Sequence, residues 1–318
     1  MVADETASET AGGAASGDGL SGAGDSREVD SRDWWDYRPV FSTVDKGGRI
    51  TGLAPGERPG QLTGRLLISS ALCFIGWGIA SLLGTSLLCG GTSAPAGSCA
   101  VDVPGEVPVG WAIVAAIIGG YLTLFVTTDV TEQARQEFGQ RRVASFLRSA
   151  PLLAGLVAGA AISVVTALRI DTAETIRRTT QGLVGTEAIA ISAALAILAG
   201  LWWIAVVLRL PGALLHAHRR QTTIERLRRD GHRYDGQVRL GDIIYWLGNN
   251  PELHVTIEYD SPAGHHQRRA RMRTSPDRVP VDGSRVIVYD DLRGDVHVEL
   301  NRAARPAWAP EARYTPSE

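Results

Sequence analysis

The chain has 318 residues, of which 44% are hydrophobic, and a formal net charge of -2. That near-neutral total hides a strong segregation of charge, because the first 36 residues carry nine acids and two arginines whereas later segments are basic. The acidic amino terminus lacks the charged-then-apolar pattern of a signal peptide, so we expect no cleaved secretion signal. We therefore expect the first apolar segment to act as an uncleaved insertion signal.

Residues 1–63 are expected to form a disordered acidic tail followed by a Gly/Pro-rich linker. Gly, Ala, Ser, Asp and Glu dominate the beginning of the chain, and such a composition buries too little apolar surface to fold. An aromatic cluster follows, formed by Trp34, Trp35 and Tyr37. Because aromatic residues dominate binding hot spots, this cluster is a candidate contact for a protein partner. The alternative is that it packs on the chain's own cytosolic domain or lies on the lipid headgroups.

Four long apolar stretches indicate an integral membrane protein. A bilayer core needs about 20 apolar residues in a helix, and a helix satisfies its own backbone in lipid. The sequence therefore predicts a four-helix transmembrane domain over residues 64–210, with spans at about 66–88, 109–130, 151–168 and 188–210. In the third span, Gly155 and Gly159 allow a neighbouring helix to approach closely. Packing within one chain is favoured over a dimer contact, although a homo-oligomer stays open.

The loops set the orientation of these spans. Arg and Lys are concentrated before the first span, between the second and third, and after the fourth, whereas the loop between the first and second has none. By the positive-inside rule, both termini should be cytosolic in a multi-pass protein of the cell membrane.

Cys89 and Cys99 fall in the loop that is expected to lie outside the cell. The exterior is oxidising, and a short flexible loop brings two sulfurs within reach of each other. A disulfide is the favoured interpretation, and two unpaired small residues are the alternative. A metal site is disfavoured because this loop has no histidine.

A basic helix over residues 211–231 is expected just inside the membrane, after Pro211 and Gly212 interrupt the last apolar stretch. Basic side chains at this depth attract anionic inner-leaflet lipids, at about 1 kcal/mol each. Arg219 and Arg220 are the candidate lipid or partner contacts in this helix.

A small β domain is predicted over residues 236–302. Leu253, Val255, Ile257 and Tyr259 alternate with polar residues, and this period of two is typical of strands. Turn-forming residues separate the alternating runs. The pattern predicts five strands in a small antiparallel barrel of the SH3-like or OB type, which closes its own edges. The remaining residues, 303–318, are expected to form a disordered tail.

Arg269, Arg271 and Arg273 lie at a spacing of two on one predicted strand and should share a face. The first interpretation is a solvated face that pairs with Glu258. The second is contact with the anionic inner leaflet. Nucleic-acid binding through phosphate contacts is disfavoured, because the exposed aromatic residues that stack bases are not evident.

The stretch Val279–Leu300 contains the run Gly283-Ser284-Arg285-Val286-Ile287-Val288-Tyr289-Asp290. It resembles an uncharacterised bacterial membrane-protein family that couples transmembrane helices to a small β domain ending in a Gly-x-x-Val-x-Val motif followed by Tyr-Asp. The strong preference for Arg, with Lys46 the single lysine, is typical of a GC-rich bacterial genome such as that of actinobacteria. The resemblance implies no established activity and no catalytic residues.

The sequence contains no Walker, G-x-S-x-G or H-E-x-x-H motif, and we expect no catalytic, cofactor or metal site. The spans are nearly free of ionisable side chains, which mark ion and substrate paths in membranes. We therefore expect a non-enzymatic adaptor or assembly protein that presents its β domain at the inner leaflet to lipid or to an unknown protein partner. A channel or transporter subunit is the alternative.

Overall fold

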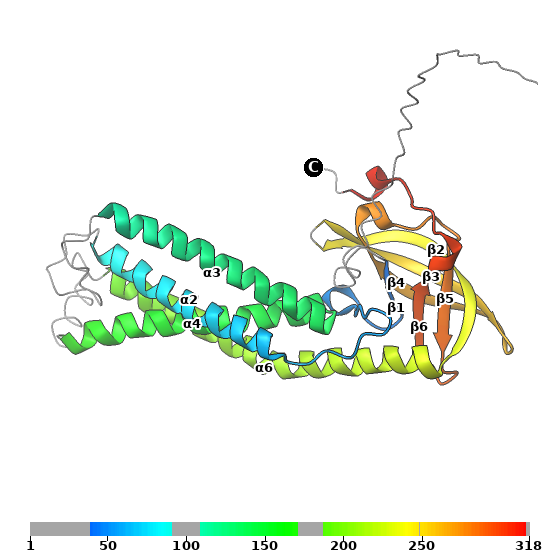
Figure 1. Ribbon diagram of the computed structural model, residues 1–318, viewed down its shortest axis with the longest axis horizontal. Coiled ribbons are helices and arrows are strands. Elements are labelled where there is room, and N and C mark those ends of the chain that lie inside the picture. The colour runs from blue at the N-terminus through cyan, green and yellow to red at the C-terminus, as the bar shows by residue number, and fades with distance from the viewer. Residues whose placement is uncertain (1–38, 91–108, 171–186, 248, 316–318) are drawn as a thin grey trace, which may run out of the picture.

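Long helices and one antiparallel sheet make up the computed structural model, which describes residues 39–90, 109–170, 187–247 and 249–315 (Figure 1). The helices are α2 (Gly64–Gly90), α3 (Val109–Phe138), α4 (Arg141–Ile170) and α6 (Glu187–Asp230). The strands are β1 (Val40–Ser42), β2 (His232–Leu247), β3 (Asn250–Ser261), β4 (Gly264–Arg273), β5 (Arg285–Asp290) and β6 (Val296–Leu300). Short 3-10 turns are η2 (Gly47–Arg49), η3 (Pro276–Arg278), η4 (Arg302–Ala304) and η5 (Glu311–Tyr314).

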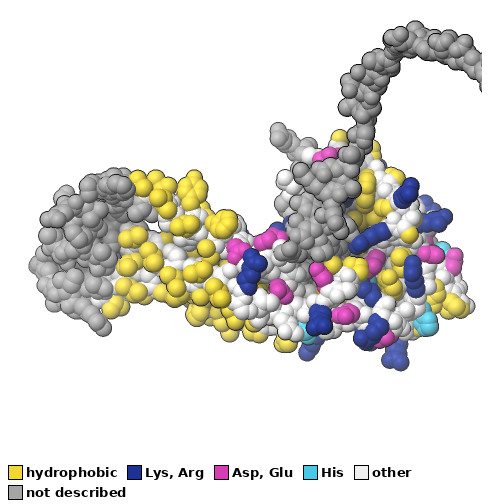
Figure 2. All heavy atoms as spheres, in the orientation of Figure 1, with side chains coloured by type: hydrophobic (Ala, Val, Ile, Leu, Met, Phe, Trp, Pro, Cys, Tyr) yellow, Lys and Arg dark blue, Asp and Glu magenta, His cyan; other side chains and the backbone are white. Residues whose placement is uncertain are grey.

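The helices form an elongated bundle with the sheet at one end, where α2 and α4 begin and α3 and α6 end (Figure 1). Hydrophobic side chains cover the visible face of the bundle, and charged side chains gather on the sheet end (Figure 2). Within the described residues, three helical stretches are long and apolar enough to cross a membrane, namely Gly64–Gly84, Arg141–Val165 and Ala193–Asp230. The predicted helical bundle is therefore present, and three of its helices qualify as membrane spans by length and composition in the described part of the chain.

The predicted close approach at Gly155 and Gly159 is confirmed, and the neighbour is α2 of the same chain. A Cβ on Gly155 would stand 2.3 Å from the carbonyl oxygen of Phe74, and one on Gly159 would stand 2.3 Å from that of Gly78. No side chain fits at that distance, so the two helix backbones pack directly on each other.

Helix α6 continues through Pro211 instead of ending there, so the expected juxtamembrane helix is its second half. A proline removes one backbone hydrogen bond and usually kinks or breaks a helix unless the surrounding structure holds it. Here Leu210 and Leu214, on either side of Pro211, pack against the apolar core that α2, α3 and α4 share. One helix thus reaches from the bundle to the sheet.

The sheet is a nearly closed barrel in which every pairing is antiparallel and the strand order is β1-β4-β3-β2-β5-β6. The predicted alternation on β3 is confirmed, because Leu253, Val255, Ile257 and Tyr259 are all buried in the barrel core. The observed barrel has six strands, one more than the five predicted. The added strand, β1, comes from the amino-terminal segment and pairs with the end of β4.

Residues 39–63 and 303–315, which we expected to be disordered, pack on the rest of the molecule. Ile50 and Leu53 are buried, and the Gly52 N–H donates to the Gly139 carbonyl between α3 and α4. At the other end of the chain, Trp308 forms a β-bridge with Pro280, and Tyr314 is buried in the barrel core. Both segments contain isolated apolar residues that lack periodicity, and tertiary packing alone orders them.

The run Gly283–Asp290 has a structural role. Gly283 adopts a positive φ of 78°, a conformation that favours glycine. Val286 and Val288 are fully buried. The Asp290 carboxylate accepts the hydroxyl of Tyr259 at 2.7 Å and the Leu292 N–H at 2.8 Å, which fixes the turn that follows β5.

Candidate functional site

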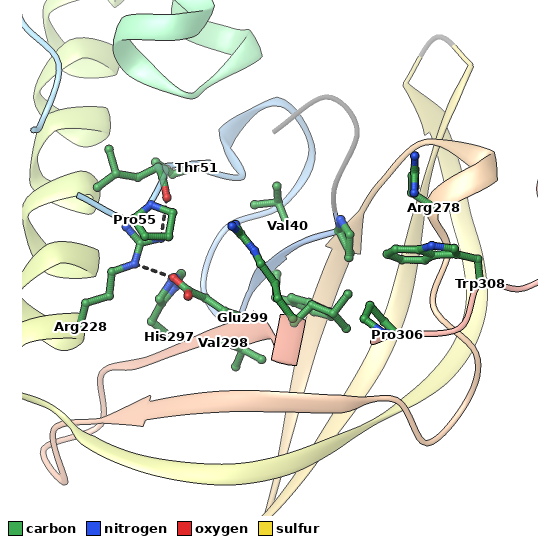
Figure 3. Close-up of a pocket in the computed structure, with 15 residues that line it drawn as sticks. Val40, Thr51, Pro55, Arg228, Arg278, His297, Val298, Glu299, Pro306 and Trp308 are labelled. Atoms are coloured by element: carbon green, nitrogen blue, oxygen red, sulfur yellow. Dashed lines mark hydrogen bonds and ion pairs between the residues drawn. The ribbon is translucent and has the colours of Figure 1, made fainter. Parts of the chain in front are cut away.

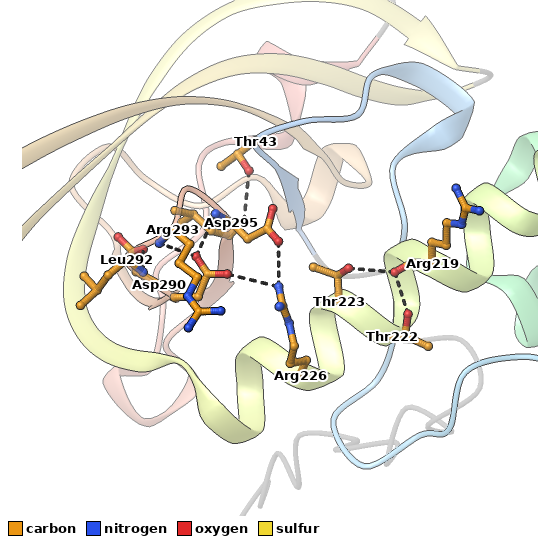
Figure 4. A network of polar contacts seen from close by, with 11 residues as sticks. Thr43, Arg219, Thr222, Thr223, Arg226, Asp290, Leu292, Arg293 and Asp295 are labelled. Carbon is orange, nitrogen blue, oxygen red and sulfur yellow. Dashed lines mark hydrogen bonds and ion pairs between the residues drawn. The ribbon is translucent and has the colours of Figure 1, made fainter.

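The second half of α6 lies against the turn between β5 and β6. The Arg226 guanidinium donates to the Asp291 carboxylate at 3.2 Å and to that of Asp295 at 2.8 Å (Figure 4). The Asp291 carboxylate also accepts the backbone N–H groups of Arg293 and Asp295. The turn is therefore shaped to present two carboxylates to one arginine of the helix.

Arg228, half a turn further on, joins three parts of the molecule. Its Nε donates to the Glu299 carboxylate of β6, and its two terminal nitrogens donate to the carbonyl oxygens of Ala54 and Leu53. His297 approaches the same Glu299 oxygen through Nε2 at 2.9 Å. A partly buried guanidinium with several charge-assisted hydrogen bonds fixes its neighbours in orientation as well as in position. Arg228 thus couples α6, the barrel and the amino-terminal segment.

The protonation states at this junction follow from burial and charge. Burial lowers the pKa of His297, despite the neighbouring Glu299 carboxylate. Burial also opposes ionisation of Glu299, but the hydrogen bond from His297 and the charge of Arg228 outweigh it and hold the pKa of that carboxyl below its usual range. Among the described residues, His297 Nδ1 is buried without a hydrogen-bond partner. A neutral imidazole that donates from Nε2 accounts for this arrangement.

Arg220 lies in a second contact between α6 and the amino-terminal segment. It is buried, with its Nε 3.7 Å from the Asp45 carboxylate, which also contacts His216 Nε2 at 2.9 Å. Arg220 therefore faces protein, whereas its neighbour Arg219 is exposed to solvent. Only Arg219 of this predicted pair is free to reach a lipid or a partner.

The three arginines of β4 share a face but not an environment. Arg269 is exposed, Arg271 is half-buried and Arg273 is buried. Arg271 donates to the fully buried Glu252 carboxylate at 2.9 Å, and that carboxylate also accepts the Gly47 N–H.

The expected partner of the β4 arginines, Glu258, pairs instead with Arg239 on β2. The β4 arginines therefore do not form one open basic surface, because Glu252 and the amino-terminal segment cover part of it. Burial and the Glu252 carboxylate raise the pKa of the adjacent Tyr245 to about 12.

A cavity of about 260 Å³ opens beside Arg228, between the two terminal segments and β6. Pro39, Thr51 and Pro55 line it from the amino-terminal side, and Pro306 and Trp308 line it from the carboxy-terminal side. Figure 3 shows the ring of Trp308 on one side of this cavity and the joined pair of Arg228 and Glu299 on the other. Its walls are mostly apolar, with arginines at both sides.

A cluster of polar side chains lies inside the bundle near the barrel. Ser69 Oγ donates to the Asp129 carboxylate at 2.8 Å, and the Gln133 amide donates to both. Further along the same two helices, Trp77 Nε1 donates to Thr127 Oγ1 at 2.9 Å. These hydrogen bonds link α2 to α3.

Several predicted candidates lie outside the described residues. Trp34, Trp35, Tyr37 and Cys99 are among them, and the disulfide between Cys89 and Cys99 has no structural support. Cys89 belongs to the last turn of α2.

Sequence reasoning missed Arg228, His297 and Glu299. His297 and Glu299 alternate on β6 with the apolar Val296, Val298 and Leu300, and Arg228 of α6 joins their face to the amino-terminal segment. No distinct sequence signal marks this pair, because Glu252 and His254 have the same spacing of two on β3.

In the part of the chain that the structure describes, no group of three or more His, Cys, Asp or Glu side chains is arranged to hold a metal ion. No protein-family model, curated protein or solved structure matches the chain. The resemblance to a bacterial membrane-protein family and the SH3-like or OB type of the barrel therefore stay predictions.

Proposed function

We propose that this chain is a membrane-anchored adaptor or assembly protein that holds its barrel at a fixed position on the inner leaflet, where a protein partner is recruited. The observation that carries the proposal is the continuity of α6, which runs from the apolar bundle to the barrel and binds it through Arg226 and Arg228. A flexible tether would allow the barrel to move freely. A continuous helix with an exposed ion pair at Arg226 and a largely buried one at Arg228 instead sets the distance and orientation of the barrel relative to the bilayer.

The proposal places four spans in the membrane, with both termini in the cytosol. The fourth span is α3, whose exposed side chains include Ile118, Leu122 and Phe125, as a lipid-facing helix requires. The basic residues near the barrel end of the bundle favour a cytosolic barrel. A disulfide between Cys89 and Cys99 at the opposite, external end belongs to the same proposal, and alkylation of the unreduced protein followed by mass spectrometry tests it.

Anionic lipids are the proposed contacts of the exposed arginines of α6. Arg209 and Arg219 are both exposed, and basic side chains next to an anionic leaflet gain about 1 kcal/mol each. The double variant Arg209→Gln with Arg219→Gln should therefore retain less anionic lipid on purification than the wild-type protein. Arg293→Gln, an exposed change in the turn between β5 and β6, is the matched control and should retain as much as the wild type.

Crosslinking with mass spectrometry in native membranes tests the adaptor function. We expect a stable neighbour whose crosslinks map to the barrel and weaken in the double variant Arg226→Ala with Arg228→Ala, which loosens the barrel. Arg229→Ala, which alters an exposed arginine paired with Asp230, should leave the crosslinks unchanged. The absence of any stable neighbour would contradict the adaptor function.

Transport is the second candidate, and the polar cluster of Ser69, Asp129 and Gln133 is the observation that favours it. Polar side chains at membrane depth mark ion paths. These groups hydrogen-bond to one another, however, so packing of α2 on α3 accounts for them. Ion flux through vesicles that contain the purified protein, lost on Asp129→Asn, would establish transport.

A further inference from the structure

The cavity beside Arg228 lies where the barrel fails to close. β1 and β6 are the two edges of the sheet, and no strand pairing joins them in the part of the chain that the structure describes. A hydrogen bond from Thr43 Oγ1 to the Val296 carbonyl, at 3.1 Å, spans the gap. An unpaired strand edge is a template for an extended chain, and both edges contribute residues to the cavity.

The direction of the strands shows which segment can reach this gap. Six strands joined by antiparallel pairings place β1 and β6 in opposite directions. Thr43 lies beside Val296, at the start of β6. Because the two strands run in opposite directions, Pro39 lies toward Leu300, at the end of β6. Pro39 and Arg302 line the same cavity. The residues that precede Pro39 thus start at the cavity wall and need no linker to enter it.

The walls of the cavity complement that preceding segment in chemistry. Pro306 and Trp308 offer flat apolar surfaces, and the Arg278 guanidinium lies 5.5 Å from the centre of the Trp308 ring. Arg302 adds a second, exposed cation. The segment 33–37 reads Asp-Trp-Trp-Asp-Tyr, which supplies aromatic rings for the prolines and Trp308 and carboxylates for the arginines.

The size of the cavity also favours a side chain as the occupant. Its volume of about 260 Å³ lies below the roughly 300–1,000 Å³ of typical small-molecule and cofactor sites. One or two large side chains on an extended backbone fill such a space. A tethered segment has an additional advantage, because a short tether raises the effective concentration to the millimolar range.

We propose that residues 33–37 dock in this cavity of their own chain, extending β1 past the end of β6 toward Arg302 and Pro306. A tryptophan of the segment packs on Pro306 and Trp308, and its carboxylates face Arg278 and Arg302. The cavity is thereby a peptide-binding site that is occupied from within. An acidic, aromatic peptide must displace this segment in order to bind.

Hydrogen exchange of the full chain in nanodiscs that hold one copy each tests the proposal. We expect the backbone amides of residues 34–38 to exchange at least about tenfold more slowly than an unstructured chain, which corresponds to about 1.4 kcal/mol of docking free energy. Arg302→Glu should abolish that protection. Arg305→Glu, an exposed change three residues away and outside the cavity lining, should preserve it.

A second variant changes the segment and leaves the barrel intact. Trp34→Ser with Trp35→Ser should also remove the protection, while the amides of β3 stay protected. Exchange of the wild-type segment at the unstructured rate would overturn the proposal, and so would protection that survives Arg302→Glu. Protection that disappears in single-copy discs and returns when copies are concentrated in detergent would assign the occupant to a second copy and overturn docking within one chain.

Discussion

Arg228 on α6 and Glu299 on β6 form an ion pair across the boundary between the membrane bundle and the barrel. Both side chains are largely buried. The terminal nitrogens of Arg228 donate hydrogen bonds to two backbone carbonyls of the amino-terminal segment. The pair therefore fixes three segments that are far apart in the sequence. Without Arg228, the carbonyl oxygens of Leu53 and Ala54 would lose this donor, and the Glu299 carboxylate would lose its cation while keeping the contact with His297.

Arg228→Ala should destabilise the folded protein by about 3 kcal/mol. Removing one partner of a buried ion pair typically costs 3–5 kcal/mol, and the lower end applies because Glu299 keeps some exposure. Arg229→Ala is the control, since Arg229 is exposed and surface changes stay within about 0.5 kcal/mol. Thermal unfolding of both variants in nanodiscs gives the comparison. Equal midpoints would show that the ion pair adds nothing.

Stability should fall as the pH drops below the usual pKa of histidine, and His297 should cause part of that fall. Burial lowers the pKa of folded His297 below 6.5, so the unfolded chain binds a proton that the folded chain does not. The stability that neutral His297 contributes is present above pH 6.5 and is lost as the pH falls from there toward the lower folded value. The facing Glu299 carboxyl has a pKa of about 2 and stays ionised through this range.

His297→Gln keeps a donor toward Glu299 and removes the titrating group. The midpoint of thermal unfolding should therefore fall less in this variant than in the wild type between about pH 7.5 and about pH 5.5. Parallel curves for the two proteins would show that His297 is protonated equally in the folded and unfolded states.

The turn between α3 and α4 requires glycine at position 139. Gly139 has a φ of 58°, and a Cβ there would stand 1.7 Å from the Gly52 carbonyl oxygen. Gly56 has a φ of 86° with nothing within 4 Å, so Gly56→Ala measures backbone strain alone, at about 1–2 kcal/mol. Gly139→Ala should cost clearly more, because the amino-terminal segment must also move. Chemical denaturation of the two variants measures the difference.

Close packing of α2 on α4 should make Gly159 intolerant of substitution. Gly159→Ile inserts a branched side chain where the Gly78 carbonyl lies 2.3 Å from the Cβ position, and it should lower the midpoint of thermal unfolding. Gly120→Ile on α3 meets nothing within 4 Å and should be tolerated. If both variants melt alike, the small residues of α4 have no packing role.

The apolar stretches and the barrel core could be predicted from the sequence because both depend on local periodicity. Val255 and Ile257 are buried as their alternation indicates, and the Gly155–Gly159 step packs as its spacing indicates. In both cases the residues that predict the packing lie on one face of a single helix or strand.

The junction could not be predicted, because it depends on contacts between distant segments. β1 is only three residues long, too short for a period of two to be seen. The face of β6 that bears His297 looks solvated until α6 and the amino-terminal segment cover it. Pro211 indicates a helix end, and only the packing of its flanking leucines on the bundle keeps the helix continuous.

A pair of topology reporters tests the central claim, that the barrel is fixed to the cytosolic end of the bundle. Green fluorescent protein fused after Glu318 should fluoresce, and alkaline phosphatase fused there should be inactive. The same reporters inserted within residues 91–108 should give the opposite result. Active phosphatase after Glu318 in intact cells would place the barrel outside and contradict the account.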